Sequence, residues 1–97
     1  MSDWPLEVED QEGRELELSR ERWMHIVSRH GELSGMQDEI INTIESPGEI
    51  LKQSGRDDTF HYFRSVDGLE YNDYICAVVN IEECFIVTAY PTSRKKV

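Results

Sequence analysis

Two apolar runs near the C-terminus constrain the fold of this chain more than any other feature. They read YICAVVNI at residues 74–81 and CFIVTAY at residues 84–90, and only two glutamates separate them. Runs of β-branched and aromatic residues joined by so short a connection are typical of an antiparallel hairpin. If the turn is tight, residues whose numbers sum to about 165 face each other, so Cys76 should lie near Ala89.

The two cysteines, Cys76 and Cys84, stand in these runs. A disulfide within a hairpin needs directly opposed residues, and the tight register does not oppose the cysteines to each other. We therefore expect two reduced, buried thiols, as in a cytoplasmic protein. The sequence has no CxxC and no HExxH motif, so we expect neither a metal site nor a cofactor.

The 97 residues suffice for one small domain, residues 1–97. Further strands are predicted at TFHYFRSV, residues 59–66, and at the short segment EILKQ, residues 49–53. Two helices are predicted before them, at residues 20–30 and 36–45. A serine at the N-cap position precedes the first helix, and the tripeptide Ser-Pro-Gly stops the second.

The N-terminal segment LEVEDQEGRELELS, residues 6–19, alternates apolar and acidic residues around Gly13. This pattern predicts a β-hairpin, and the alternative is a frayed acidic tail. The predicted fold class is α+β, with an N-terminal β-hairpin, two helices, and then an antiparallel sheet of about three to four strands. Residues 1–18 form the acidic hairpin or arm, and residues 19–97 form the core of the domain.

The charge is strongly acidic and unevenly distributed. Twenty acidic against ten basic residues give a net charge of −10, which argues against a general nucleic-acid or membrane-surface binder. The N-terminus lacks the features of a secretory signal, and no apolar run approaches the roughly 18 residues that span a bilayer. Residues 91–97, however, contain Arg94, Lys95, Lys96 and no acid. They form either a local basic site or only a soluble tail.

The segment RWMHIVSRHGEL, residues 22–33, carries two of the three histidines. Projection on a helix gives two stripes. The apolar stripe holds Trp23, Ile26, Val27 and His30. The basic stripe holds Arg22, His25 and Arg29. Because His30 lies in the apolar stripe, we interpret it as a core histidine. His25 belongs either to a solvated basic face or to an anion site, because guanidinium groups suit phosphate and an imidazole exchanges a proton near neutral pH.

The last strand ends in two hydroxyl residues, Thr88 and Tyr90, which strict alternation places on one face together with Cys84 and Ile86. They are either donors in a cleft or a strand edge that leaves the core. On the strand at residues 59–66, His61 and Arg64 should point to opposite faces, so at most one of them joins a given site.

Three ordered motifs carry a resemblance to a known family. The run Trp23-x-His25-Ile26-x-x-Arg29-His30-x-Glu32-Leu33 resembles the W-x-H-I-x-x-R-H-P-E-L helix of the phage-associated branch of the barnase–EndoU–colicin–RelE-like (BECR fold) nucleases. The second helix ends in Thr43-Ile44-x-x-Pro47-x-x-Ile50, similar to the family's T-I-x-x-P-x-x-I, and the terminal Val87-Thr88-Ala89-Tyr90 fits V-T-A-Y before a basic tail. Gly31 stands where the family usually has proline.

The resemblance implies N-terminal helices packed against an antiparallel sheet, a nuclease-like core, and metal-independent RNA cleavage. By matched position it points to His25, His30, Arg29, Thr88 and Tyr90 as catalytic residues. His25 would be base or acid, with His30 as the second acid–base group or as its orienter. Arg29 would stabilise charge on the phosphoryl oxygens, and Thr88 and Tyr90 would donate to the phosphate. The candidate substrate-binding residues are Arg22, Arg64 and Lys95.

Two functions therefore remain open at the level of sequence. One is a toxin-like endoribonuclease that acts by transesterification through a 2′,3′-cyclic phosphate. The other is a catalytically silent binding module of the same fold that acts through protein–protein contacts. The expected partners are RNA in the first case and an inhibitory or regulatory protein in the second, and no membrane in either.

Overall fold

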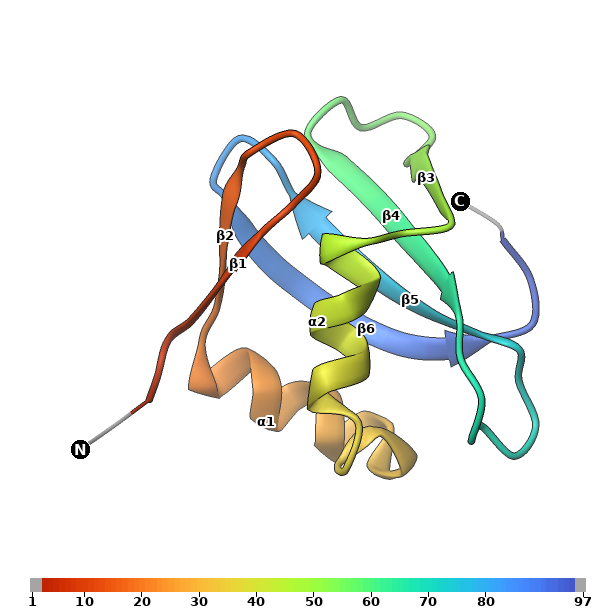
Figure 1. Cartoon of the computed structure of the whole chain (residues 1–97). Helices are drawn as coiled ribbons and strands as arrows, with labels where there is room; N and C mark the ends of the chain where they lie inside the picture. Colours follow the sequence, from red (N-terminus) through yellow and green to blue (C-terminus); the bar gives the residue numbers. More distant parts are fainter. Residues whose placement is uncertain (1–2, 96–97) are drawn as a thin grey trace.

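The helices and strands occur where the sequence predicts them, to within two residues at each end. A computed structural model describes residues 3–95 and shows an α+β fold (Figure 1). Its elements are β1 (Leu6–Glu9), β2 (Glu15–Leu18), α1 (Arg20–Arg29), a 3₁₀ turn η1 (Gly31–Leu33), α2 (Gln37–Glu45), β3 (Glu49–Lys52), β4 (Thr59–Ser65), β5 (Tyr74–Asn80) and β6 (Phe85–Thr92). Within residues 3–95 no helix is long and apolar enough to cross a membrane.

All strands join one sheet in the order β1-β2-β6-β5-β4-β3. The four strands after the helices are antiparallel neighbours, as predicted. The predicted strand number and purely antiparallel pairing are wrong for the sheet as a whole, because the N-terminal hairpin is part of it. β2 pairs in parallel with β6 at Glu17 and Phe85, and the Glu17 amide donates to the Cys84 carbonyl at 3.0 Å. The sheet is therefore six-stranded and mixed.

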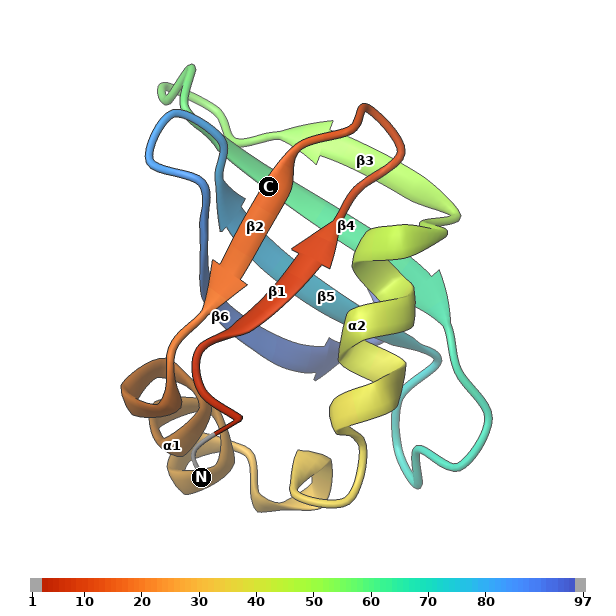
Figure 2. The ribbon, with the colours of Figure 1, turned by 60° about the vertical axis from the view of Figure 1, so that its left-hand side comes forward.

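The helices cover one face of this sheet, which we name the helix-covered face. Figure 2 shows the β1–β2 hairpin and α2 side by side in front of β4 and β5. The main core on this face includes Leu16, Leu18, Ile26, Leu33, Ile40, Ile44, Tyr62, Ile75, Ala77, Val79, Ile86 and Ala89. The tip of the hairpin is fixed to β4 because the Tyr62 hydroxyl donates to the Asp10 carboxylate at 2.7 Å.

A second, smaller cluster lies on the opposite face, which we name the helix-free face. It consists of Phe63, Cys76 and Val78, with Leu51, Val87 and Tyr90 packed against them. All six come from strands β3 to β6. This face therefore carries both Tyr90 and, by register, Thr88, which pairs with Val78.

The β5–β6 register differs from the predicted one. Cys76 lies opposite Tyr90 rather than near Ala89, because a bulge at Val78 and Val79 leaves Val87 without a partner in β5. The bulge also breaks the predicted alternation, so Ile86 faces the main core while Val87 and Tyr90 face the other way. An extra residue in one strand shifts the register and re-aims the side chains that follow it.

The turn between β5 and β6 is longer than the two glutamates that the sequence suggests. It spans residues 81–84, and the Asn80 side-chain oxygen accepts from the amides of Glu82 and Glu83. Cys84 closes this turn with a positive φ of 57°. Both cysteines are free, as predicted; Cys76 is buried, but Cys84 is only half-buried, so its predicted burial is wrong.

Candidate functional site

Helix α1 lies beside β6 and runs in the same direction (Figure 1). Near the start of both, the Arg22 guanidinium lies 5.9 Å from the centre of the Phe85 ring. Near the end of both, the rings of His30 and Tyr90 are 6.2 Å apart and tilted by 40°. The buried Ile26 anchors the helix in the core between these two contacts. The helix therefore borders the sheet along β6.

His30 occupies the C-cap of α1, where its backbone amide donates to the Ile26 carbonyl at 2.8 Å. Its side chain is half-buried and does not belong to either core cluster. The prediction of a core histidine from the apolar stripe is therefore wrong. The ring lies at the border of the helix and the sheet, next to Tyr90.

The basic stripe of α1 keeps its polar side-chain atoms available. Among residues 3–95, the side chains of Arg22, His25, Arg29 and Thr88 form no hydrogen bond or ion pair with another described residue. His25 is half-buried and Arg29 is exposed. These groups are thus free to bind a ligand, but no hydrogen bond, ion pair or ring contact within residues 3–95 joins His25 or Arg29 to Thr88 or Tyr90. Their convergence on one cleft stays a prediction.

Tyr90 is the most constrained of the predicted site residues. Burial, together with the opposed Cys76 thiol, raises the pKa of the Tyr90 phenol well above its ordinary value. Burial also raises the pKa of Cys76 to about 11. Both groups are therefore protonated at neutral pH, and neither is a ready nucleophile.

From Cys76, a hydrogen-bonded chain of side chains crosses the helix-free face. The Cys76 sulfur lies 3.6 Å from Nδ1 of His61, and Nε2 of His61 lies 3.0 Å from the Gln53 side-chain oxygen. Burial lowers the pKa of His61. The sequence indicated His61 as a candidate residue without giving it a role. It did not indicate that Cys76 and Gln53 contact His61. Only the correct register, in which Cys76 opposes both Tyr90 and Phe63, would have revealed this chain.

Arg64 does not join Tyr90. It pairs with Ile75, a residue of the main core, and its Nη1 donates to the Ser46 carbonyl at 2.6 Å. Arg64 therefore lies on the helix-covered face, opposite to His61, as the alternation in β4 predicts.

Lys95 lies on the helix-free face, away from α1. Its Nζ is 4.8 Å from the centre of the Tyr74 ring and 3.2 Å from a carboxylate oxygen of Glu49. The ion pair with Glu49 offsets its charge, so Lys95 is a weaker candidate for phosphate binding than Arg22 or Arg29. Lys96, part of the predicted basic tail, lies outside the described residues.

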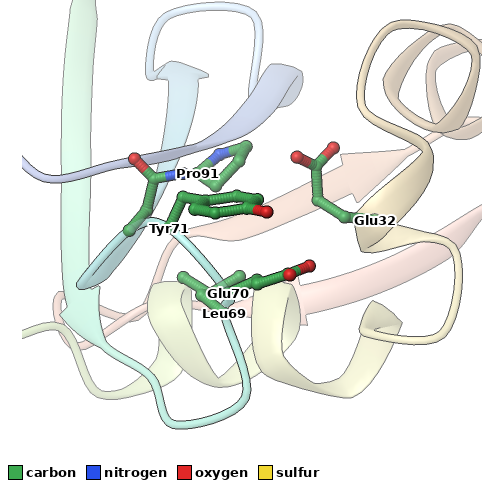
Figure 3. A pocket seen from close by; sticks show the side chains of 6 residues that line it. Glu32, Leu69, Glu70, Tyr71 and Pro91 are labelled. Carbon is green, nitrogen blue, oxygen red and sulfur yellow. The ribbon is translucent and has the colours of Figure 1, made fainter.

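Two hollows flank β6. One, of about 220 Å³, lies on the helix-free face and is lined by Gln53, Arg56, Thr59, Val78, Asn80, Phe85 and Val87. The other, of about 90 Å³, is lined by Glu32, Leu69, Glu70, Tyr71, Asn72 and Pro91. Figure 3 shows the Tyr71 ring beside Pro91, with the carboxylates of Glu32 and Glu70 on either side. Two carboxylates and no cation disfavour a phosphate in this second hollow.

Comparison of the chain with protein-family models, curated proteins and solved structures found no match. Within residues 3–95, no three side chains of His, Cys, Asp or Glu are grouped so that they could hold a metal ion. The function is therefore inferred from the arrangement of the side chains on α1 and β6.

Proposed function

We propose that this protein is a metal-independent endoribonuclease of the BECR type, with RNA bound along β6 at the border between α1 and the helix-free face. The observation that carries the proposal is the contact between His30 and Tyr90. It unites an imidazole from the end of the first helix with a phenol from the last strand, two positions that the family resemblance also indicates.

The proposed reaction is transesterification within one RNA strand. His30 takes the proton of a 2′-hydroxyl, and the resulting oxygen attacks the adjacent phosphorus. The 5′-oxygen then leaves with a proton from His25, which closes a 2′,3′-cyclic phosphate. Arg29 and Thr88, whose side chains have no partner within residues 3–95, donate to the phosphoryl oxygens. The Tyr90 hydroxyl orients the reacting groups beside His30.

The larger hollow suits a nucleobase elsewhere on the same RNA strand. Its lining includes the aromatic residue Phe85 and the amide residues Gln53 and Asn80. Stacking of a base on an aromatic ring contributes about 1–3 kcal/mol and tolerates different bases. Because Phe85 begins β6 and Tyr90 lies near its end, a bound strand would follow β6.

The test is cleavage of labelled single-stranded and structured RNAs, with and without EDTA, followed by analysis of the ends. We expect 2′,3′-cyclic phosphate ends, formed equally well in EDTA. His30→Gln should lower kcat/KM by about 100-fold or more, and Tyr90→Phe by about tenfold. Tyr74→Phe is the matched control, because Tyr74 is a phenol of the neighbouring strand outside the His30 contact.

Equal cleavage by the parent and by His30→Gln, purified in parallel, would identify a contaminating nuclease. Absence of cleavage by every preparation would overturn the proposal.

The second candidate is a silent binding module, and the face of the hairpin favours it. Four exposed glutamates pair across β1 and β2, Glu7 with Glu17 and Glu9 with Glu15. Like charges directly opposite each other destabilise a sheet, and a basic surface on a regulatory or inhibitory protein would relieve this repulsion. Absence of cleavage together with binding of such a protein would support this function.

A further inference from the structure

A chain of polar side chains leads from Tyr90 to the far side of the helix-free face. Tyr90 on β6 lies directly opposite Cys76 on β5 and packs against the cluster that contains it. Hydrogen bonds then join Cys76 to His61 on β4, and His61 to Gln53 in the loop after β3. Cys76 has no exposed surface, and His61 is 8% exposed. Apart from Tyr90, none of these side chains has a part in the proposed reaction. Burying a chain of polar side chains lowers the stability of the fold unless every member has a hydrogen-bond partner.

The partners fix the direction of each bond. The Gln53 side-chain oxygen can only accept, so Nε2 of His61 carries the hydrogen. Because burial favours the neutral ring, Nδ1 then holds a lone pair. The Cys76 thiol therefore donates to Nδ1, which leaves the sulfur lone pairs to accept from the hydroxyl of the opposed Tyr90. A Tyr90 hydroxyl that donates to this sulfur has only oxygen lone pairs to offer on its other side.

We propose that His61 is a positioning residue for Tyr90: held in its Nε2–H tautomer by Gln53, it acts through the Cys76 thiol to fix the direction of the Tyr90 hydroxyl. This inference rests on the proposed function, which supplies the reaction in which the Tyr90 hydroxyl takes part. It changes the role of Tyr90 from a donor to the phosphate into an acceptor for a substrate hydroxyl beside His30. The phosphate donors are then Arg29 and Thr88.

The direct test uses NMR on the full chain without RNA. The ¹⁵N signals of His61 should show the neutral Nε2–H tautomer at pH 7. In protein with ¹³C-labelled tyrosine, the Cζ signal of Tyr90 should move in Cys76→Val, which removes the thiol at similar volume, and return in Cys76→Ser, which keeps a donor and an acceptor. The Cζ signal of Tyr74 is the internal control.

A variant far from Tyr90 distinguishes positioning from packing. Gln53 is half-buried at the rim of the larger hollow, so Gln53→Leu should leave the fold intact. We expect it to give a mixture of His61 tautomers and to move the Tyr90 Cζ signal. An imidazolium or an Nδ1–H tautomer in the parent protein would overturn the proposal. So would a Tyr90 signal that is identical in the parent, Cys76→Val and Gln53→Leu.

Cleavage provides the second readout. Loss of one neutral hydrogen bond predicts a three- to tenfold lower kcat/KM, roughly, in Cys76→Val and Gln53→Leu, with recovery in Cys76→Ser. If the NMR signatures hold and the parent cleaves no RNA, the ribonuclease proposal fails while the positioning of Tyr90 stands. If the parent cleaves RNA and the signatures are absent, the positioning role fails alone.

Discussion

At the scale of single residues, Asp10 is a nearly buried carboxylate held by four hydrogen bonds. It accepts from the amides of Glu12 and Arg14, from the Arg14 guanidinium at 2.8 Å, and from the Tyr62 hydroxyl at 2.7 Å. Burial by itself raises the pKa of this carboxyl, but the hydrogen bonds outweigh it and hold the pKa of Asp10 below its usual range. The bond to Tyr62 spans 52 positions of the sequence and fastens the hairpin to β4.

We expect Tyr62→Phe to lower the free energy of unfolding by about 1.5–3 kcal/mol at pH 7, because it leaves a buried carboxylate short of a donor. Because the pKa of Asp10 is lower in the folded than in the unfolded protein, ionised Asp10 stabilises the fold at pH values above its unfolded pKa. This stabilisation is lost as the pH falls through the folded pKa of Asp10. The difference between parent and variant should therefore shrink below about pH 4. Urea unfolding at several pH values measures it. Glu12→Gln, in the same turn, is the control; an equal effect of both variants would contradict the expectation.

At the scale of elements, α1 depends on its first turn. The Ser19 hydroxyl accepts from the Arg22 amide at 3.1 Å, so Ser19→Ala should lower the unfolding free energy by about 1 kcal/mol. Ser19→Asp keeps an acceptor and should restore it. Ser28→Ala, in the same helix, should change little, because Ser28 donates only to the exposed His25 carbonyl. Urea titrations followed by circular dichroism compare the three variants, and an equal loss in Ser19→Ala and Ser28→Ala would argue against the cap.

The same scale shows what the sequence can and cannot predict. Helix limits follow from local signals such as Ser19 before α1 and the Ser46-Pro47-Gly48 stop after α2, and their prediction is confirmed. The partner of Cys76 could not be predicted, because CFIVTAY is apolar on both faces and alternation cannot reveal which residue is the bulge. That one position decides whether Cys76 meets Ala89 or Tyr90, and with it the hydrogen-bonded chain to His61.

At the scale of the whole molecule, the unpredicted feature is the parallel pairing of β2 with β6. The hairpin itself was predictable from its alternation around Gly13. Its docking depends on contacts remote in sequence, such as Glu17 with Cys84 and Asp10 with Tyr62. As a consequence, the acidic residues of β1 and β2 share a face with Phe85, because directly paired residues of neighbouring strands point to the same side.

This placement predicts that the hairpin weakens RNA binding. A variant with glutamine at Glu7, Glu9, Glu15 and Glu17 removes four of the 20 acidic residues and keeps the backbone. A glutamate and an RNA phosphate roughly 10 Å apart in water repel each other by about 0.4 kcal/mol. Screening over one Debye length leaves about a third of this repulsion. Four such charges correspond to about threefold tighter binding of single-stranded RNA near 100 mM salt, where the Debye length is about 10 Å. The gain should be larger at about 50 mM and smaller at about 200 mM.

Fluorescence anisotropy with a labelled single-stranded RNA measures this difference, once circular dichroism has shown that the variants are folded. The matched control neutralises four acids of α2 and the β4–β5 loop, Asp38, Glu39, Glu45 and Asp67. Both variants have the same net charge, but the control acids lie on α2, which covers the opposite face of the sheet from Phe85, and on the β4–β5 loop. Equal gains in both variants would mean that net charge alone weakens RNA binding. No gain in either, at any salt concentration, would show that the hairpin does not oppose RNA, and would favour its glutamates as the docking surface for a basic protein.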